Sequence, residues 1–151
     1  MRILVAAIGR AKAGPHLALE RFYAERLSWK VTLAELEEKR RLPVPELREK
    51  EGALLLERLP AGAVAVALDE RGATISSAKF AEKLGFWEND GREIAFLIGG
   101  ADGHAEAVRK RADLLLGFGA MTWPHLLVRG MLFEQLYRAQ QILAGHPYHR
   151  E

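Results

Sequence analysis

The stretch IAFLIGGADG, residues 94–103, joins five consecutive apolar residues to a turn that holds three glycines in five positions. A continuous apolar run without polar alternation is typical of a strand buried on both faces, as in a parallel sheet covered by helices. Glycine lets the backbone approach a ligand closely and adopt positive φ angles. The stretch therefore predicts a central strand that ends in a ligand-binding loop.

Four further segments extend the same sheet. Ile3–Ile8 and Val64–Leu68 are also continuous apolar runs, and we expect both to be buried strands. Val31–Leu36 alternates apolar with polar residues and is expected nearer an edge of the sheet. Leu114–Phe118 is a weaker candidate for a fifth strand.

Helical patterns fill the intervals between these strands. The first begins at Gly14-Pro15, because proline is tolerated in the first turn of a helix, and its apolar face extends to Leu27. Others are expected at 45–58, from Ser76 or Ser77 to about 87, at 105–112 and at 125–144. Strands that alternate with helices predict an α/β fold with a mostly parallel sheet flanked by helices. No linker or repeat divides residues 1–151, so we expect a single domain.

The composition limits the class of protein. With 151 residues, 49% of them hydrophobic, the chain can bury one sizeable core. No apolar run approaches the length of a membrane-spanning helix, and Ile3–Ile8 is shorter than the core of a secretory signal. The absence of cysteine excludes disulfides and thiolate metal sites. We expect a cytoplasmic protein with no membrane partner.

The net charge of +2 includes two basic triplets, Lys39-Arg40-Arg41 and Arg109-Lys110-Arg111. Such triplets can contact phosphates, but each can equally be a solvated helix end or loop. The sequence alone leaves both interpretations open.

Three loops with special backbone chemistry follow expected strands, at 68–72, 98–103 and 117–124. In open α/β sheets, ligands bind beyond the carboxyl ends of the strands. The loop Gly9–Gly14 lacks the Lys-Ser/Thr of a phosphate-binding P-loop, and no G-x-G-x-x-G follows a strand. We therefore expect a ligand other than NAD or ATP, held by backbone amides and carbonyls between apolar walls.

The chain ends in HPYHRE, residues 146–151, which concentrates reactive side chains where termini are usually dispensable. His146 and His149 have no third metal ligand near them in the sequence and are separated by Pro147, so no metal site is expected. His146 is better suited to satisfying the end of the last helix.

Four blocks in the last third carry a resemblance to a known family: LIGG-x-x-G, T-x-PH-x-LVR, LYRA and HPYHRE. Together they resemble the SPOUT superfamily of S-adenosylmethionine-dependent RNA methyltransferases, and within it the ribosomal RNA large subunit methyltransferase H family. The resemblance extends over essentially the whole chain. It implies a homodimer with a deep C-terminal trefoil knot, a feature that chains almost always avoid. It also implies methylation of N3 of a pseudouridine in 23S rRNA of the assembled 70S ribosome, and no DNA partner.

The same resemblance assigns the site residues. The S-adenosyl-L-methionine positions are Leu68, Gly100, Gly119, Ala120, Met121, Thr122, Trp123 and Pro124. Leu68 would pack near the adenosine, Gly100 would leave room for it, and the 119–124 backbone would bond the adenine edge.

The catalytic positions that the resemblance implies are Tyr148, His149 and Arg150. His149 is a reasonable base, because imidazoles titrate close to neutral pH. Arg150 would hold a phosphate or stabilise negative charge on the base, and Tyr148 would stack on it or hydrogen-bond to it. Which of them takes the proton stays open.

Other residues of the last helix have competing interpretations. His125 is expected to close the loop before it through hydrogen bonds, and Arg129 to reach RNA or a partner subunit. Met131, Phe133 and Tyr137 either form a dimer interface or contact the sheet. His16 and His104 give no signal beyond the surface.

Two other functions compete with an RNA methyltransferase. One is a protein of the same fold that binds ribosomal RNA without catalysis, which would not bind S-adenosylmethionine. The other is a flavodoxin-like or nucleotide-binding domain, against which the missing phosphate loop argues.

Overall fold

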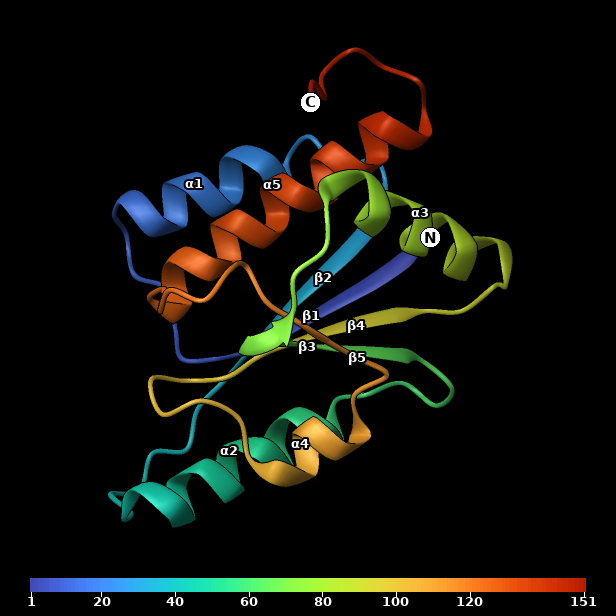
Figure 1. The fold of residues 1–151 in the computed structure, drawn as a ribbon. Helices are drawn as coiled ribbons and strands as arrows, with labels where there is room; N and C mark the ends of the chain where they lie inside the picture. Colours follow the sequence, from blue (N-terminus) through green and yellow to red (C-terminus); the bar gives the residue numbers. More distant parts are fainter.

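All 151 residues are described by a computed structural model, in which five parallel strands form one sheet with helices on both faces (Figure 1). The strands are β1 (Arg2–Ile8), β2 (Lys30–Leu36), β3 (Val64–Ala73), β4 (Ile94–Ile98) and β5 (Leu114–Leu116). Their order across the sheet is β2-β1-β4-β3-β5, and every neighbouring pair is parallel. The α/β prediction with a mostly parallel sheet is confirmed.

The three continuous apolar runs are the three central strands. All five residues of β4 are buried, as are Val64–Leu68 of β3 and most of β1. The alternating segment is the edge strand β2, as expected. β3 is longer than predicted, because after an irregularity following Leu68 it pairs again, Ala73 with Leu116. The expected loop at 69–72 is therefore the bulged end of a strand.

The helices are α1 (Pro15–Ala24), α2 (Val44–Glu57), α3 (Ser77–Asn89), α4 (Glu106–Arg111) and α5 (His125–Leu143). α1, α3 and α5 cover one face of the sheet, and α2 and α4 cover the other (Figure 1). The predicted cap of α3 is present, since Ser76 Oγ accepts a hydrogen bond from the Lys79 amide at 3.1 Å. No helix is long and apolar enough to cross a membrane.

The last helix, α5, seals the larger core. Leu132, Leu136 and Ala139 are fully buried, whereas Leu143, in the last turn of the helix, is 44% exposed. Phe133 is 2% exposed and belongs to this core, so of its two interpretations the contact with the sheet holds and the dimer interface does not. The trefoil knot, which rests on resemblance alone, stays a prediction.

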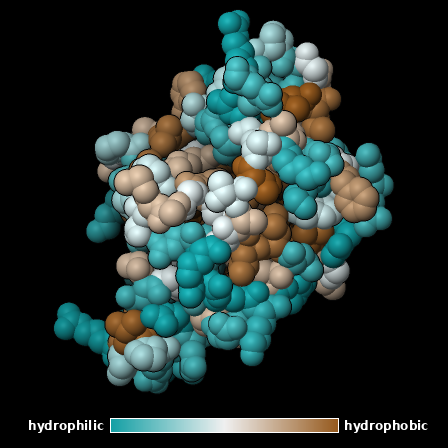
Figure 2. Space-filling view, in the orientation of Figure 1, coloured by the Kyte–Doolittle hydropathy of each residue, from teal (hydrophilic) through white to brown (hydrophobic).

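A mostly apolar cavity of about 540 Å³ opens on the α1–α5 face. Leu19 of α1, Met131 of α5 and Phe80 of α3 line it, together with Phe118 beyond β5. Figure 2 shows apolar residues gathered in the middle of this face of the molecule.

Arg129 is the largest fully buried side chain, with 0% exposure. Its guanidinium pairs with Glu35 of β2 at 2.7 Å and donates to the carbonyls of Ile8 (3.2 Å) and Gly9 (2.8 Å). The expectation that Arg129 reaches RNA or a partner subunit is therefore wrong. A buried guanidinium needs such partners, because an unpaired buried charge is very costly.

Two carboxylates, Glu20 and Glu35, lie near this guanidinium, and their pKa values are shifted in opposite directions. Burial raises the pKa of Glu20, which is 5% exposed. Burial alone would also raise the pKa of Glu35, but hydrogen bonds from Arg129 and the Ala11 amide lower it. Glu35 is therefore the ionised partner of Arg129, and its two hydrogen bonds join β2 to α5 and to the segment after β1.

We expect Arg129→Met to lower the free energy of unfolding by about 3–5 kcal/mol, because it leaves Glu35 without its cation and the carbonyls of Ile8 and Gly9 without the Arg129 donor. The measurement is urea unfolding at one protein concentration. Arg2→Met is the control, since its pair with Glu93 is solvent-exposed and such pairs contribute less than about 1 kcal/mol. Equal effects of the two substitutions would contradict the prediction.

Candidate functional site

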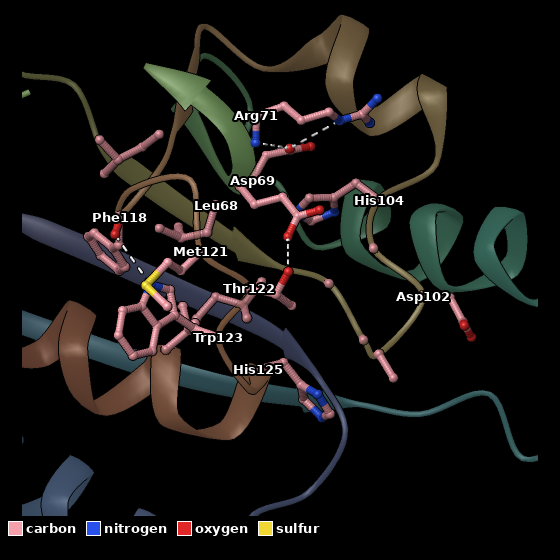
Figure 3. A pocket seen from close by; sticks show the side chains of 18 of the residues that line it. Leu68, Asp69, Arg71, Asp102, His104, Phe118, Met121, Thr122, Trp123 and His125 are labelled. Atoms are coloured by element: carbon pink, nitrogen blue, oxygen red, sulfur yellow. Dashed lines mark hydrogen bonds and ion pairs between the residues drawn. The ribbon is translucent and has the colours of Figure 1, made fainter. Parts of the chain in front are cut away.

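A cavity of about 440 Å³ lies at the carboxyl edge of the sheet, beyond the ends of β3, β4 and β5 (Figure 3). This volume is typical of small-molecule sites, which occupy roughly 300–1,000 Å³. The three predicted loops supply most of its lining, and the first turns of α5 complete it. The lining residues used below are Leu68, Asp69, Gly100, Asp102, His104, Phe118, Gly119, Met121, Thr122, Trp123 and His125, with Arg48 from α2.

Six of the eight predicted cofactor positions line this cavity: Leu68, Gly100, Gly119, Met121, Thr122 and Trp123. Ala120 and Pro124 belong to the same loop but are not part of the lining. The predicted cofactor positions thus mark this cavity, where the fold brings Leu68 together with Trp123, more than 50 positions later in the chain.

The backbone of the loop 119–123 is free to bind a ligand. None of its amide groups makes a hydrogen bond within the chain, and because residues 120–123 are exposed, these amides are open to solvent or a ligand. Gly119 has φ +103°, a conformation that residues with a Cβ rarely adopt. Five adjacent amides without partners beside an apolar wall fit the heteroatom edge of an adenine-like ring.

Side chains hold this loop in place. Thr122 Oγ1 donates to Glu70 Oε2 at 2.8 Å, and Trp123 Nε1 donates to the Phe118 carbonyl at 3.3 Å. The Trp123 ring lies along the loop beside the Met121 side chain (Figure 3). Met121 is 72% exposed and therefore forms the mouth of the cavity rather than its floor.

The rear of the cavity is a polar network around Asp69. This carboxylate accepts from the Arg71 amide at 2.8 Å and forms an ion pair with Arg109. Burial alone would raise the pKa of Asp69, but these contacts hold it below its usual value. Asp69 therefore stays ionised and fixes the bulged end of β3.

His104 belongs to the same wall, and its expected surface position is wrong. The ring is 9% exposed, and its Nε2 lies 3.2 Å from the Leu97 carbonyl. Burial lowers the pKa of His104, so the imidazole is neutral at pH 7.

The loop after β4 is fixed by α2. Arg48 Nε donates to the Asp102 carbonyl at 3.0 Å. A Cβ on Gly100 would lie 3.1 Å from both Ile8 Cγ2 and Glu51 Oε2, so only glycine fits without displacing them. Burial, and then the charge of Asp102, raise the pKa of Glu51. Gly100 thus permits close packing of the loop that bounds the cavity.

His125 lines the cavity but does not close the loop by hydrogen bonds, as had been expected, because its ring makes none. Instead the ring packs at Gly9, where a Cβ would lie 3.4 Å from its Nε2. Burial, and then the charges of Arg129 and His16, lower the pKa of His125. It is therefore a neutral imidazole in the wall of the cavity.

The C-terminal residues lie against the second half of α5. Their partners Glu134 and Arg138 are the tenth and fourteenth of its 19 residues, about 14 and 20 Å along the axis from the helix start. None of Tyr148, His149 and Arg150 lines the cavity. The chain end lies above the far end of α5 in Figure 1, well away from the carboxyl edge of the sheet.

The tail folds back onto α5. The Tyr148 ring packs edge-on against Tyr137 at 4.8 Å, and its hydroxyl donates to Glu134 Oε1 at 3.2 Å. His149 Nδ1 lies 3.2 Å from Arg138 Nη1. Arg150 is exposed and makes no contact of this kind. Burial and the charge of Glu134 raise the pKa of Tyr148 to about 12.

His146 caps the tail's own turn, because its Nδ1 accepts from the Tyr148 amide at 3.2 Å. His149 has separate partners, and no group of three or more His, Cys, Asp or Glu side chains is arranged to hold a metal.

An open parallel α/β sheet with a backbone-lined cavity at its carboxyl edge defines a ligand-binding α/β domain, and its family follows from sequence comparison. The family model described as "Predicted SPOUT methyltransferase" matches residues 1–149. The chain is 60% identical over 151 residues to the ribosomal RNA large subunit methyltransferase H of Rhodospirillum centenum, covering 99% of each chain. The protein of the same name from Paramagnetospirillum magneticum gives the same identity and coverage. That of Paracoccus denitrificans is 47% identical over 159 residues, covering 100% of both chains.

These matches make the protein a methyltransferase of the SPOUT class. More particularly, the chain belongs to the ribosomal RNA large subunit methyltransferase H family. S-adenosylmethionine is the cofactor of such enzymes, and the free amides at 119–123 and the apolar Leu68 fit its adenosine. Among solved structures, the SpoU methyltransferase AviRb of Streptomyces viridochromogenes aligns with 96% of this chain and 60% of its own, at 14% identity and a TM-score of 0.49.

We expect Gly119→Ala to weaken S-adenosylmethionine binding by about tenfold or more, since the new Cβ strains a backbone that must present its amides. Isothermal titration calorimetry measures the dissociation constant. Gly62→Ala is the matched control: its φ is +75°, it has the same open surroundings, and it lies outside the cavity. Unchanged binding by the Gly119 variant would contradict the role of this loop.

Proposed function

We propose that this protein methylates N3 of a pseudouridine in 23S rRNA of the assembled 70S ribosome, as a homodimer. One observation carries the proposal: the row of unpaired backbone amides at the carboxyl edge of the sheet, in a chain whose relatives are named as ribosomal RNA methyltransferases. A ribosomal substrate places the protein in the cytoplasm and makes RNA, rather than DNA or a membrane, its partner.

S-adenosylmethionine supplies a methyl group already activated on a sulfonium sulfur. The chain then has to bind the adenosine, align the acceptor nitrogen and remove its proton. The 119–124 segment would hold the adenine edge and Leu68 would pack against the adenosine, while Gly100 lets the loop that bounds the cavity pack against Ile8 and Glu51. The cofactor would supply the methyl group to N3, and a base on the protein would take the N3 proton.

Two imidazoles can serve as that base. His125 lies in the cavity wall of the same chain and is neutral at pH 7. His149 belongs to the tail, where it packs at Arg138 and does not line the cavity of its own chain, so in this arrangement it would serve as the base in a partner subunit's cavity. Tyr148, with a pKa of about 12, stays a phenol at neutral pH, so it donates a hydrogen bond or stacks on a base rather than accepting the proton.

A homodimer resolves the separation between cavity and tail. The apolar cavity on the α1–α5 face shares Leu116, Phe118 and Gly119 with the cofactor cavity. A second subunit seated there buries an exposed apolar surface and comes within reach of the cofactor. Tyr148, His149 and Arg150 of the partner then complete the site.

A mixing experiment tests whether the tail acts in trans. With the cofactor held well below its wild-type dissociation constant, the variant lacking residues 146–151 should not methylate 70S ribosomes, and Gly119→Ala should do so at about a tenth of the wild-type rate or less. Co-refolded at equal amounts, they should recover about a quarter of the wild-type rate, because half the dimers are mixed and each has one intact site. Recovery is measured by tritium transfer from labelled cofactor.

Two outcomes would contradict this arrangement. Full activity of the truncated protein would remove the tail from the reaction. An absence of recovery, with mixed dimers verified by mass, would place the tail beside its own cavity instead.

The substrate is tested by mass spectrometry of 23S rRNA from cells lacking the protein, with and without its restoration. We expect loss of one methyl group on one pseudouridine and its return with the wild-type protein. An unchanged methylation pattern, together with normal binding of 70S ribosomes, would instead favour a binding-only role.

A further inference from the structure

The two basic triplets of the sequence differ in how many of their side chains are paired within the fold. In the second, Arg109 pairs with Asp69, and Arg111 donates to the Ala63 carbonyl and pairs with Asp113. These contacts hold both arginines against the protein, so their guanidinium groups are already paired. In the first triplet only Arg40 is paired, with Glu38 at 2.9 Å, while Lys39 and Arg41 are exposed and without an ionic partner.

The free cations of the first triplet follow a strand whose end adjoins the end of β1. β1 and β2 are neighbours, and the Gly9 amide donates to the Leu36 carbonyl at 2.8 Å where both strands end. The segments 9–14 and 37–43 therefore leave the sheet at neighbouring points, and then diverge toward α1 on one face and α2 on the other (Figure 1). Lys12, in the first of them, is also exposed and has no ionic partner.

This basic region continues into the cofactor cavity. Arg48 of α2 follows the second segment, donates to the Asp102 carbonyl and lines the cavity. The segments 9–14 and 37–43 and the loop 99–103 all lie at the left of Figure 1, where the strands end. Figure 2 shows mostly hydrophilic residues around the start of α2, at the lower left, with a small apolar group among them.

The local charge exceeds that of the whole chain. Residues 9–14 and 37–50 contain seven Lys and Arg against four Glu, a net charge of +3, whereas all 151 residues together carry +2. A net positive region at the rim of a cavity raises the local concentration of a negatively charged ligand. We name Lys12, Lys39, Arg41 and Arg48 the basic edge.

We propose that the basic edge binds the phosphate backbone of the RNA whose target base enters the cofactor cavity. This inference rests on the proposed function, since it takes its partner from the RNA substrate. A base in the cavity brings its neighbouring phosphates to the rim, and long exposed Lys and Arg side chains pair with phosphates without reading sequence. The basic edge thus provides affinity and orientation, while the cavity selects the nucleotide.

The test is the triple variant Lys12→Ala, Lys39→Ala, Arg41→Ala, with Arg48 retained because it supports the cavity. We expect binding to 70S ribosomes lacking the methyl group to weaken at least about tenfold, and the slope of log K against log[salt] to fall by about two to three. KM for ribosomes should rise with kcat nearly unchanged, and S-adenosylmethionine affinity should stay the same.

The matched control is Lys30→Ala, Arg58→Ala, Lys110→Ala, which removes the same charge from exposed, unpaired positions outside the basic edge. Equal weakening by both triple variants would show a general charge effect and overturn the proposal, as would unchanged binding by the first. If the wild-type protein binds the cofactor but does not methylate ribosomes, the proposed function fails instead. In that case, weakened binding to an acidic protein by the first variant alone would make the basic edge a protein-docking surface and overturn its assignment to RNA.

Discussion

The guanidinium of Arg129 is the constraint on which the site depends. It emerges from the first turns of α5 and meets Glu35 of β2 and the carbonyls of Ile8 and Gly9 at the end of β1. The last helix is thereby fixed against the first two strands, at the carboxyl edge of the sheet. His125 and Val128 lie on the same turns and line the cavity, and the cofactor loop ends where this helix begins. A shift of α5 would therefore move the loop and the cavity wall together.

The length of that same helix separates two parts of the chemistry. Tyr148 and His149 pack on Glu134, Tyr137 and Arg138 in the second half of α5, about 14–20 Å along the axis from the helix start at the cavity. In this arrangement the helix keeps the ordered tail out of the cavity of its own chain. The tail of this chain is thus ordered on the surface of α5, outside its own cavity. The simplest way to bring a tail to a cavity is to take it from a second copy of the chain. The apolar cavity next to the cofactor cavity is the surface on which such a copy would come close enough.

The sequence predicted most of the fold because burial and periodicity are local signals. Buried central strands read as continuous apolar runs, and glycine at their carboxyl ends marked the cavity. The failures are residues whose roles depend on distant partners. From the sequence alone Arg129 was expected to be an exposed cation, but the ends of β1 and β2 bury it. His104 was likewise expected at the surface, but it packs against the end of β4. No sequence pattern indicated that Arg48 would line the cavity, because its contact with the Asp102 carbonyl depends on how α2 packs against the sheet.

The two basic triplets show why composition alone could not assign the RNA-binding surface. Both have three cations in a row, and only the geometry of the sheet separates them. The second triplet lies on α4, where Asp69 and the Ala63 carbonyl take up its guanidinium groups. The first lies beyond the end of β2, where no acceptor from the sheet reaches Lys39 or Arg41. A cation already paired inside the fold gains little from a phosphate, whereas a hydrated free cation exchanges solvent and counterions for it. Position relative to the carboxyl edge, rather than the number of charges, therefore decides which triplet is available to RNA.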